Sequence, residues 1–384
     1  MLRAENFGIN LARIRTKRNM KQREIAEALY LTPQTVSKWE QGQTFPELAN
    51  VIRIADILNV SVEELLKEPE KGEKRSLFLG IDGGGTKTEG VLFDGDGTVL
   101  HRVLQSASNP NAVGIEEAAH SLKLCISQLL SGGEKPEGAF LGISGAGSPK
   151  NREELKRILA DEFPKLKTVV DSDIVSVFHS VAPMKKAVAV ICGTGSVVFA
   201  NDGERFHQVG GYGYLFDKSG SGFDIGCDVL RYCMRCGDGM ETPGLLAELA
   251  ERKLGGKPKK MIPELYKRGN SYLASFSVPA FDAYRGGDPA ARKIVTENIR
   301  TLGQMIRHAV TTYDCGRTVI FSGGMKQEKE ILEPILRGCL PEDVKIVFPE
   351  LPPIFGACVY ARTAFGKEFD FDGFSERFRR SYHE

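Results

Sequence analysis

The sequence predicts two parts of different fold class: an all-α domain of five short helices over residues 1–67, followed by an α/β domain with two lobes. Three observations lead to this prediction. Apolar residues recur with helical spacing through the first part. The charged stretch 68–75, EPEKGEKR, has no apolar face and is typical of a linker. Two similar glycine-containing turns, each between two apolar strands, then indicate two related lobes, 76–184 and 185–384.

Length and composition are consistent with several domains. The 384 residues are more than one ordinary core needs. The formal charge is 51 − 50 = +1, so the chain as a whole gives no sign of a nucleic-acid or membrane partner. Eight cysteines, no signal-peptide pattern and no apolar run long enough to cross a bilayer predict a reduced, cytoplasmic protein without a membrane partner.

The helices of the first part carry recognisable start signals. Thr32 followed by Pro33 is an N-cap and first-turn pair. Ser61 with Glu64 makes a capping box for the last helix. Helices this short are stable only when they pack on each other, so we expect one compact helical domain.

The most informative stretch of the chain is Leu77 to Asp94, LFLGIDGGGTKTEGVLFD. An apolar strand ends at Asp82, and three glycines let the backbone turn with its amide groups exposed before a second strand begins. Such a turn donates hydrogen bonds to phosphate oxygens, and Asp82 is placed to hold Mg²⁺ directly or through water. The predicted phosphate-binding residues are Gly83, Gly84, Gly85, Thr86, Lys87 and Thr88.

Two better-known glycine motifs are excluded by register. A Walker loop requires a lysine six residues after its first glycine, but Thr86 stands six residues after Gly80. The dinucleotide fingerprint fails because Thr88 occupies the place of its third glycine. A phosphate-binding β-hairpin remains, with a plain glycine-rich hairpin as the alternative.

A second hairpin of the same kind favours the phosphate interpretation. Residues 187–199, AVAVICGTGSVVF, again read as strand, small-residue turn and strand. Two copies suggest two similar lobes that face each other across a nucleotide cleft. A glycine pair after the apolar run 319–322 would suit close approach to a flat adenosine ring. The residues predicted here are Gly193, Thr194, Gly195, Ser196, Gly323 and Gly324.

The order of these motifs resembles that of the actin-like ATPase (ribonuclease H-like) and sugar kinase superfamily. Within it, residues 76–365 resemble the BadF/BadG/BcrA/BcrD ATPase family, which includes the N-acetylglucosamine kinases. The resemblance implies ATP and Mg²⁺ as cofactors. It also implies an adenosine motif at 322–325 and two connecting helices, 173–178 and 356–361.

The same resemblance implies a sugar site. Asn109 matches the asparagine that holds sugar hydroxyls in N-acetylglucosamine kinases, although an Asn-Pro turn explains it equally well. Residues 210–226 match a long family motif, with Tyr212 where tryptophan is common. The implied sugar-binding residues are Asn109, Thr194, Gly195, Tyr212 and Asp217.

Two departures from the family pattern concern catalysis. Gly147 stands where we expect the aspartate that deprotonates the sugar hydroxyl, and Lys218 and Ser219 replace an acidic pair. Asp173 or Asp217 could substitute as the base, although an N-cap of the following helix explains Asp173 slightly better. The candidate catalytic residues are Asp82, Asp173 and Asp217.

Residues 20–42 resemble the helix-turn-helix of the Cro/CI-type (XRE) family, and this resemblance extends over about residues 5–67. It implies that the helix beginning near Thr32 enters the major groove of duplex DNA. Residues 1–40 carry eight Lys or Arg against four Glu, a local charge of +4 that suits phosphate neutralisation. A helical protein-interaction domain is the alternative. The implied DNA-binding residues are Gln22, Gln34, Thr35, Ser37 and Lys38.

Three functions stay open at this point. The first is a transcription regulator, expected as a homodimer, that senses and could phosphorylate an amino sugar such as N-acetylglucosamine. The second is a working kinase for such a sugar. The third is an ATPase that activates a redox partner of the 2-hydroxyacyl-CoA dehydratase type. We favour the first, because the DNA-binding positions are intact while the catalytic acid positions are altered.

The cysteines bear on the third function. Cys233 and Cys236 have the two-residue spacing of a metal site, and Cys227 lies close by in the sequence. Only one such pair exists and it falls in an expected helix, so we favour ordinary buried thiols.

Overall fold

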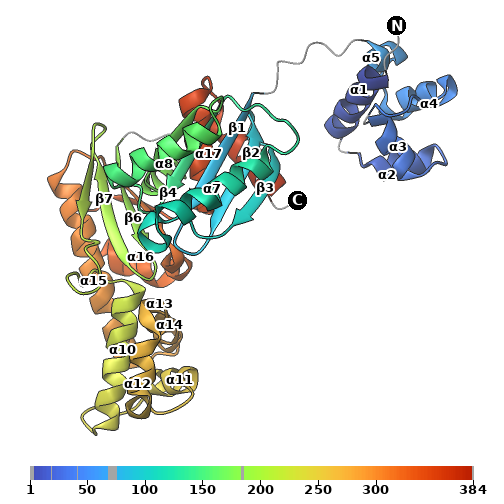
Figure 1. Ribbon diagram of the computed structural model, residues 1–384. Helices are drawn as coiled ribbons and strands as arrows, with labels where there is room; N and C mark the ends of the chain where they lie inside the picture. The colour runs from blue at the N-terminus through green and yellow to red at the C-terminus, as the bar shows by residue number, and fades with distance from the viewer. Residues whose placement is uncertain (1–3, 19, 41, 68–75, 183–185, 383–384) are drawn as a thin grey trace. The chain divides into compact units, whose positions relative to one another are not determined.

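The computed structural model describes residues 4–18, 20–40, 42–67, 76–182 and 186–382. The chain divides into two compact units, 1–75 and 76–384, each of which is described by itself (Figure 1). The predicted linker, 68–75, lies outside the described residues.

The first unit is all-α, as predicted. Its helices are α1 (Ala4–Lys17), α2 (Gln22–Ala28), α3 (Pro33–Glu40), α4 (Leu48–Leu58) and α5 (Val62–Leu66). All five contribute to one buried core, which includes Phe7, Ile25, Trp39, Ile54 and Leu65. This burial is what stabilises helices that are too short to be stable alone.

Both predicted N-caps are present in this unit, the second as a single Ser61 bond and not as the full capping box. The amide of Thr35 donates to Thr32 Oγ1 at 3.3 Å, so Thr32 caps α3 ahead of Pro33. The amide of Glu64 donates to Ser61 Oγ at 3.0 Å and caps α5. Each bond satisfies one of the amide donors that a helix start leaves without an intrahelical partner.

The second unit begins with a five-stranded sheet. Its strands are β1 (Leu77–Gly83), β2 (Thr88–Asp94), β3 (Val99–Gln105), β4 (Gly138–Ile143) and β5 (Thr168–Asp171), in the order β3-β2-β1-β4-β5. β1 pairs antiparallel with β2 and parallel with β4. The helices α6 (Pro110–Val113), α7 (Ile115–Leu129) and α8 (Pro149–Glu162) belong to this lobe.

The second lobe repeats this topology. Its strands are β6 (Ala187–Cys192), β7 (Ser196–Asn201), β8 (Phe206–Val209), β9 (Thr318–Ser322) and β10 (Lys345–Val347), in the order β10-β9-β6-β7-β8. β6 pairs antiparallel with β7 and parallel with β9, so β6 has the place that β1 has in the first sheet. The two predicted hairpins are therefore the central hairpins of two equivalent sheets.

The two predicted connecting helices lie between these sheets. They are α9 (Ile174–His179) and α17 (Pro353–Phe365), and they pack directly on each other. A Cβ added at Gly356 would lie 1.8 Å from the carbonyl oxygen of Ser176, so only glycine allows this close approach. α18 (Phe371–Tyr382) then packs Phe374 and Phe378 into the core around both helices.

A group of helices is inserted into the second lobe between β8 and β9. Figure 1 shows α10 to α14 gathered beyond the sheet, with the long helix α15 running back toward it. The inserted elements are α10 (Gly222–Gly237), α11 (Leu245–Leu254), a 3₁₀ turn (Pro258–Met261), α12 (Ile262–Lys267), α13 (Gly269–Ala274), α14 (Ser277–Arg285) and α15 (Pro289–Thr312). A second 3₁₀ turn (Gly324–Glu328) and α16 (Lys329–Arg337) follow β9.

Candidate functional site

The turn between β1 and β2 is open toward solvent. The amide of Gly84 donates to the carbonyl of Lys87 at 2.9 Å and closes the turn. The amides of Gly85 and Thr86 donate to no other described residue, and a Cβ added at Gly85 would meet no atom within 4 Å. Thr86 and Lys87 are exposed. The turn thus offers amide, hydroxyl and ammonium donors to an anion such as phosphate.

Two residues next to this turn have internal partners. Thr88 is buried in β2, and its hydroxyl donates to the carbonyl of Ser106 at 2.7 Å. Glu89, also buried, accepts hydrogen bonds from Arg102 Nε at 2.7 Å and from the hydroxyl of Tyr382. Its other oxygen lies 3.7 Å from Lys87 Nζ. The buried carboxylate of Glu89 therefore positions Lys87, a role that the sequence did not indicate.

Asp82 and Asp173 form a pair of interacting carboxylates. Burial, the Asp173 carboxylate and then Glu89 raise the pKa of Asp82 to about 7, while Lys87 lowers it. Burial also raises the pKa of Asp173, against hydrogen bonds that favour its charged form. Asp173 stands at the N-cap position of α9, but its side chain makes no capping hydrogen bond. The position of Asp173 agrees with the N-cap explanation, and a hydrogen bond from the backbone of Ile174 favours its charged form, so this explanation and a catalytic role both stay open.

Asn109 lies beside the same turn. Its backbone amide donates to the carbonyl of Gly84 at 3.2 Å, and its side-chain Nδ2 donates to Ser144 Oγ at 3.3 Å. Ser144 also hydrogen-bonds the carboxylate of Asp173. Asn109 Oδ1 accepts from the amide of Asn111, as in an Asn-Pro turn. The side chain of Asn109 therefore closes this turn and also contacts Ser144, which lies next to Asp173. Gly147 has no atom nearer than 3.9 Å to an added Cβ, so its position is roomy but carries no carboxylate.

The second hairpin turn lines two cavities. One, of about 260 Å³, is bounded by Gly193, Thr194, the start of α10, α14 and Gly324. Gly323 has a φ of 94°, and a Cβ added there would lie 2.2 Å from the carbonyl oxygen of Cys192. Gly323 thus brings the β9 loop against the end of β6, where glycine alone fits. A flat ring could approach this wall closely.

The other cavity, of about 250 Å³, lies on the side of the 210–226 motif. Thr194, Gly195, Ser196 and Asp217 all line it, together with Tyr214. Ser196 is buried and donates to the carbonyl of Ser219 at 2.9 Å. Asp217 accepts a hydrogen bond from the amide of Gly211 at 2.5 Å.

Two residues of the 210–226 motif, Tyr212 and Lys218, do not line this cavity. Tyr212 is 66 % exposed and is not part of the cavity wall. Lys218 turns away from this cavity and pairs with Asp228 at 3.0 Å.

The candidate DNA-binding residues lie on α2 and α3. Gln34 and Lys38 are exposed, and Thr35 and Ser37 are half-buried. Gln22 donates through Nε2 to Glu40 at 2.7 Å, and Arg15 pairs with the same carboxylate at 2.6 Å. This network ties α1 and α2 to the end of α3.

The cysteines of α10 show no metal site. Cys233 is buried, and Cys227 and Cys236 are half-buried. Among the described residues, no three His, Cys, Asp or Glu side chains lie close enough together to hold a metal ion. In the same part of the chain, no helix combines the length and apolarity that a membrane crossing requires.

Residues 79–361 match the model of the BadF/BadG/BcrA/BcrD ATPase family. The chain belongs to this family. Residues 11–65 match the helix-turn-helix model, so the family domain is fused to a helix-turn-helix domain. Both resemblances seen in the sequence are confirmed.

Curated relatives match each part separately. An N-acetyl-D-glucosamine kinase of Dictyostelium discoideum is 25% identical over 75% of this chain and 98% of its own length. An N-acetylmuramic acid/N-acetylglucosamine kinase of Clostridium acetobutylicum is 28% identical over 74% of this chain and 98% of its own. The HTH-type transcriptional activator BcrR of Enterococcus faecalis is 34% identical over 17% of this chain and 31% of its own.

Solved structures share the fold. A protein of Porphyromonas gingivalis assigned as an N-acetylglucosamine kinase covers 75% of this chain and 99% of its own, with a TM-score of 0.60 and 20% identity. A ROK family transcriptional regulator, a homolog of the E. coli MLC protein, covers 98% of this chain and 99% of its own, with a TM-score of 0.54 and 14% identity. The predicted fold class, an all-α domain followed by a two-lobed actin-like ATPase domain, is confirmed.

Membership of this ATPase family implies use of ATP, typically with a divalent metal. The residues present fit both groups. Gly85, Gly195 and Gly324 all face open space, so the two loops and the adenosine loop leave room that a side chain would fill. Asp82 and Asp173 place two interacting carboxylates together, with Lys87 as the cation that acts on Asp82, a donor set that a divalent cation would balance.

Proposed function

We propose that this chain is a transcription regulator in which the helix-turn-helix unit binds duplex DNA and the kinase-like unit binds MgATP and an amino sugar. The observation that carries the proposal is the fusion itself. One chain joins a helix-turn-helix with polar, exposed recognition positions to an ATPase-family unit whose phosphate loops are open. A DNA-binding head would serve no purpose on an enzyme that only phosphorylated a metabolite.

Three features support DNA binding. Gln34 and Lys38 are exposed on α3, where glutamine suits adenine and lysine suits guanine. The half-buried bond of Gln22 to Glu40 fixes the start of α2, and its amide oxygen accepts no hydrogen bond from any described residue. A solved structure named as a ROK family transcriptional regulator covers 98% of this chain with a TM-score of 0.54, so a regulator shares the fold of both parts.

Two features support amino-sugar sensing. Thr194 borders both cavities of the second lobe, so a nucleotide in one and a sugar in the other would meet at this residue. Both curated relatives of the kinase-like unit are named for acetylated amino sugars. We therefore assign N-acetylglucosamine or a close relative as the ligand, with Asn109 and Asp217 as candidate hydroxyl partners.

Closure of the two lobes on ligand would change DNA affinity in a homodimer. Half-sites are expected about 34 Å apart, one helical turn of DNA, or a multiple of it. Ligand should shift DNA affinity by about 1–3 kcal/mol, and DNA must shift ligand affinity equally. The test is titration of a duplex selected from a random pool, with and without MgATP and N-acetylglucosamine. Unchanged affinity with every sugar and nucleotide would refute sensing.

The Lys38→Ala variant tests DNA binding by the helix-turn-helix unit. If Lys38 reads guanine, the variant loses about 1–3 kcal/mol of binding on the selected duplex and relaxes its preference at one position. An equal loss on all sequences would make Lys38 a phosphate contact. Lys21→Ala, which removes a positive charge at the N-cap of α2 and outside α3, is the matched control.

Catalytic turnover is a second candidate function, favoured by the Asp82–Asp173 pair. Asp173 lies beside Asp82 and has a raised pKa, so it is suited to accept the proton of a sugar hydroxyl. That oxygen would then bond to the transferred phosphoryl group while ADP leaves. ADP release with a panel of amino sugars tests this. Asp173→Asn should abolish turnover and Asp217→Asn should mainly weaken sugar binding; the reverse pattern would assign the base to Asp217.

A further inference from the structure

A further cavity lies among the inserted helices, away from the two cavities lined by the second hairpin turn. It has a volume of about 660 Å³ and lies between α10, the loop 241–244 and the first turns of α15. It shares no lining residue with the two smaller cavities. Its volume falls within the range of roughly 300–1,000 Å³ that is typical of small-molecule sites.

Four cations line this cavity from three elements. Arg231 and Arg235 lie one helical turn apart on α10, Lys293 lies on α15, and Lys218 comes from the 210–226 motif. All four side chains keep solvent access; those of Lys218 and Arg231 are 58% and 69% exposed. Lys293 makes no ion pair with any described residue.

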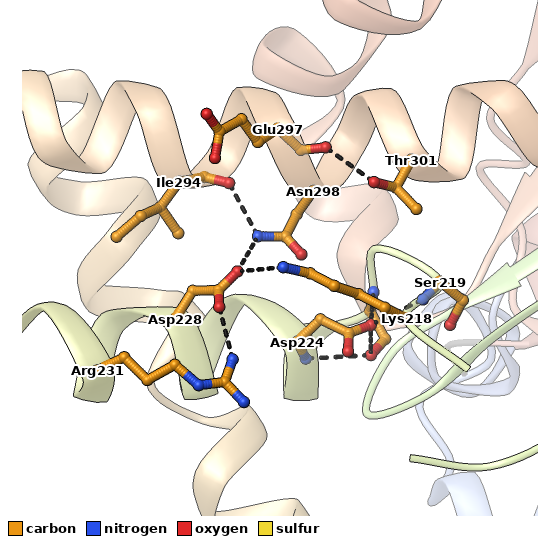
Figure 2. A network of polar contacts seen from close by, with 10 residues as sticks. Lys218, Ser219, Asp224, Asp228, Arg231, Ile294, Glu297, Asn298 and Thr301 are labelled. Carbon is orange, nitrogen blue, oxygen red and sulfur yellow. Dashed lines mark hydrogen bonds and ion pairs between the residues drawn. The ribbon is translucent and has the colours of Figure 1, made fainter. Parts of the chain in front are cut away.

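Four carboxylates also line the cavity, but two of them are already engaged. Asp288 accepts from the backbone amides of Ala291 at 2.9 Å and Leu246 at 3.0 Å, which caps α15 and fixes the preceding loop. Asp228 accepts from Lys218 at 3.0 Å, from Asn298 Nδ2 at 2.9 Å and from Arg231 at 2.7 Å (Figure 2). Neither carboxylate keeps a strong acceptor site for a ligand.

The hydrogen-bonding capacity that remains is mostly donor capacity. Arg231 uses one of its N–H groups on Asp228, and the three donors of Lys293 bond to no residue that the structure describes. Arg235 pairs with Glu241 through a single carboxylate oxygen, at 3.3 Å. The second oxygen of Glu241 and the carboxylate of Glu297 remain as acceptors for hydroxyl groups. The four cations and the four carboxylates that line the cavity balance in formal charge. The donors and acceptors that remain, however, suit an anion that also carries hydroxyls.

We propose that this cavity is a second ligand site, for a small hydroxylated anion such as a phosphorylated or carboxylated sugar. The anionic group binds Arg231 and Lys293, and the hydroxyls bind Glu241 and Glu297. The site shares no lining residue with the proposed nucleotide and sugar cavities, so anion binding does not depend on the regulator function, whereas its effect on amino-sugar affinity rests on the proposed function.

The site is coupled to the cleft through Lys218. Its neighbours in sequence, Asp217 and Ser219, line the 250 Å³ cavity, while its ammonium group bridges to Asp228 at the edge of the larger one. An anion that binds Arg231 competes with Asp228 for this side chain, and so changes the contact between Asp228 and Lys218 beside Asp217. Occupancy of the larger cavity therefore changes amino-sugar affinity by about fivefold or more.

Calorimetry on the full chain tests the site. The probes are glucose 6-phosphate and glucuronate, with glucose and inorganic phosphate as comparators. One or both anionic sugars should bind more tightly than either comparator, and Arg231→Gln/Lys293→Gln should weaken this binding at least about tenfold. Arg300→Gln/Arg307→Gln, which removes two exposed charges from α15 outside the cavity, should leave it unchanged.

Three results would overturn the proposal: no binding of either anionic sugar, equal loss in the α15 control, or simple competition by MgATP and N-acetylglucosamine, which would place the anion in the cleft. Lys293→Glu guards against misfolding of the double variant, because Lys293 is exposed and has no ion pair to lose. Lys293→Glu should weaken binding of the anionic sugar at least as much as Arg231→Gln/Lys293→Gln does. Anion binding together with a DNA affinity that no sugar or nucleotide changes would leave this site standing while the regulator proposal failed.

Discussion

The carboxylate of Asp82 has a raised pKa in the folded chain, so it destabilises the fold once it is ionised. The Asp82→Asn variant measures this loss in the free energy of unfolding. In the folded chain the pKa of Asp82 is raised from 3.8 to about 7, first by burial and then by the charge of Asp173. Below pH 4 Asp82 is protonated in both the folded and the unfolded chain, so it does not change the free energy of unfolding. Between pH 4 and pH 7 the unfolded chain releases the proton while the folded chain keeps it, so stability falls as pH rises.

The size of this loss follows from the shift. Three pKa units correspond to about 4 kcal/mol at pH 8, because each unit is worth about 1.4 kcal/mol. The residue keeps partial solvent exposure, so we expect about 1–2 kcal/mol. Asp82→Asn removes the titration. The variant should therefore match the wild type near pH 4 and exceed its free energy of unfolding by that amount at pH 8.

Urea unfolding of the nucleotide-free chain at pH 4.5 and pH 8 is the assay, read as the difference between variant and wild type. Asp161→Asn, at a side chain that is 72% exposed, is the control and should follow the wild type. MgATP should reverse the order at pH 8, because bound ligand stabilises the wild type and the variant loses it. Equal pH dependence in Asp82→Asn and wild type would refute the carboxylate pair.

Two further substitutions test the backbone and the packing. Tyr30 has a φ of 57°, which costs a tyrosine about 1 kcal/mol, so Tyr30→Gly should stabilise the first unit by that amount in thermal unfolding. Asn59→Gly, at a φ of 49° that asparagine tolerates, should gain less, and an equal gain would contradict the strain at Tyr30. Gly356→Ala should cost at least about 2 kcal/mol in urea unfolding, because its Cβ would overlap the carbonyl of Ser176 in α9; a stabilised variant would show that the connecting helices do not pack this closely.

Local patterns predicted the elements that local chemistry determines. The two hairpins, the cap at Thr32 and the start of α5 at Ser61 all depend on residues a few positions apart, and each is confirmed. The repeat of the hairpin also led to the two-sheet topology, since β1 and β6 are the central strands of equivalent sheets.

The site was harder to predict, because its residues meet only through the tertiary fold. Asp173 looked like a helix cap from its sequence neighbours, yet the parallel pairing of β1, β4 and β5 brings it to the carboxylate of Asp82. Tyr382 reaches Glu89 from the last helix, and no local signal connects them. Most predicted phosphate and sugar residues lie at the open turns or line the cavities, whereas Tyr212 is exposed away from the cavity and Thr88 is buried; the roles of all of them stay predictions.

The most direct test of the account concerns the two phosphate loops. Calorimetric titration of the full chain with MgATP should show saturable binding, and Gly85→Val and Gly195→Val should each reduce it at least about tenfold, because their side chains fill open space without a clash. Absence of nucleotide binding by the wild type, or full binding by both variants, would contradict the assignment of these loops to ATP.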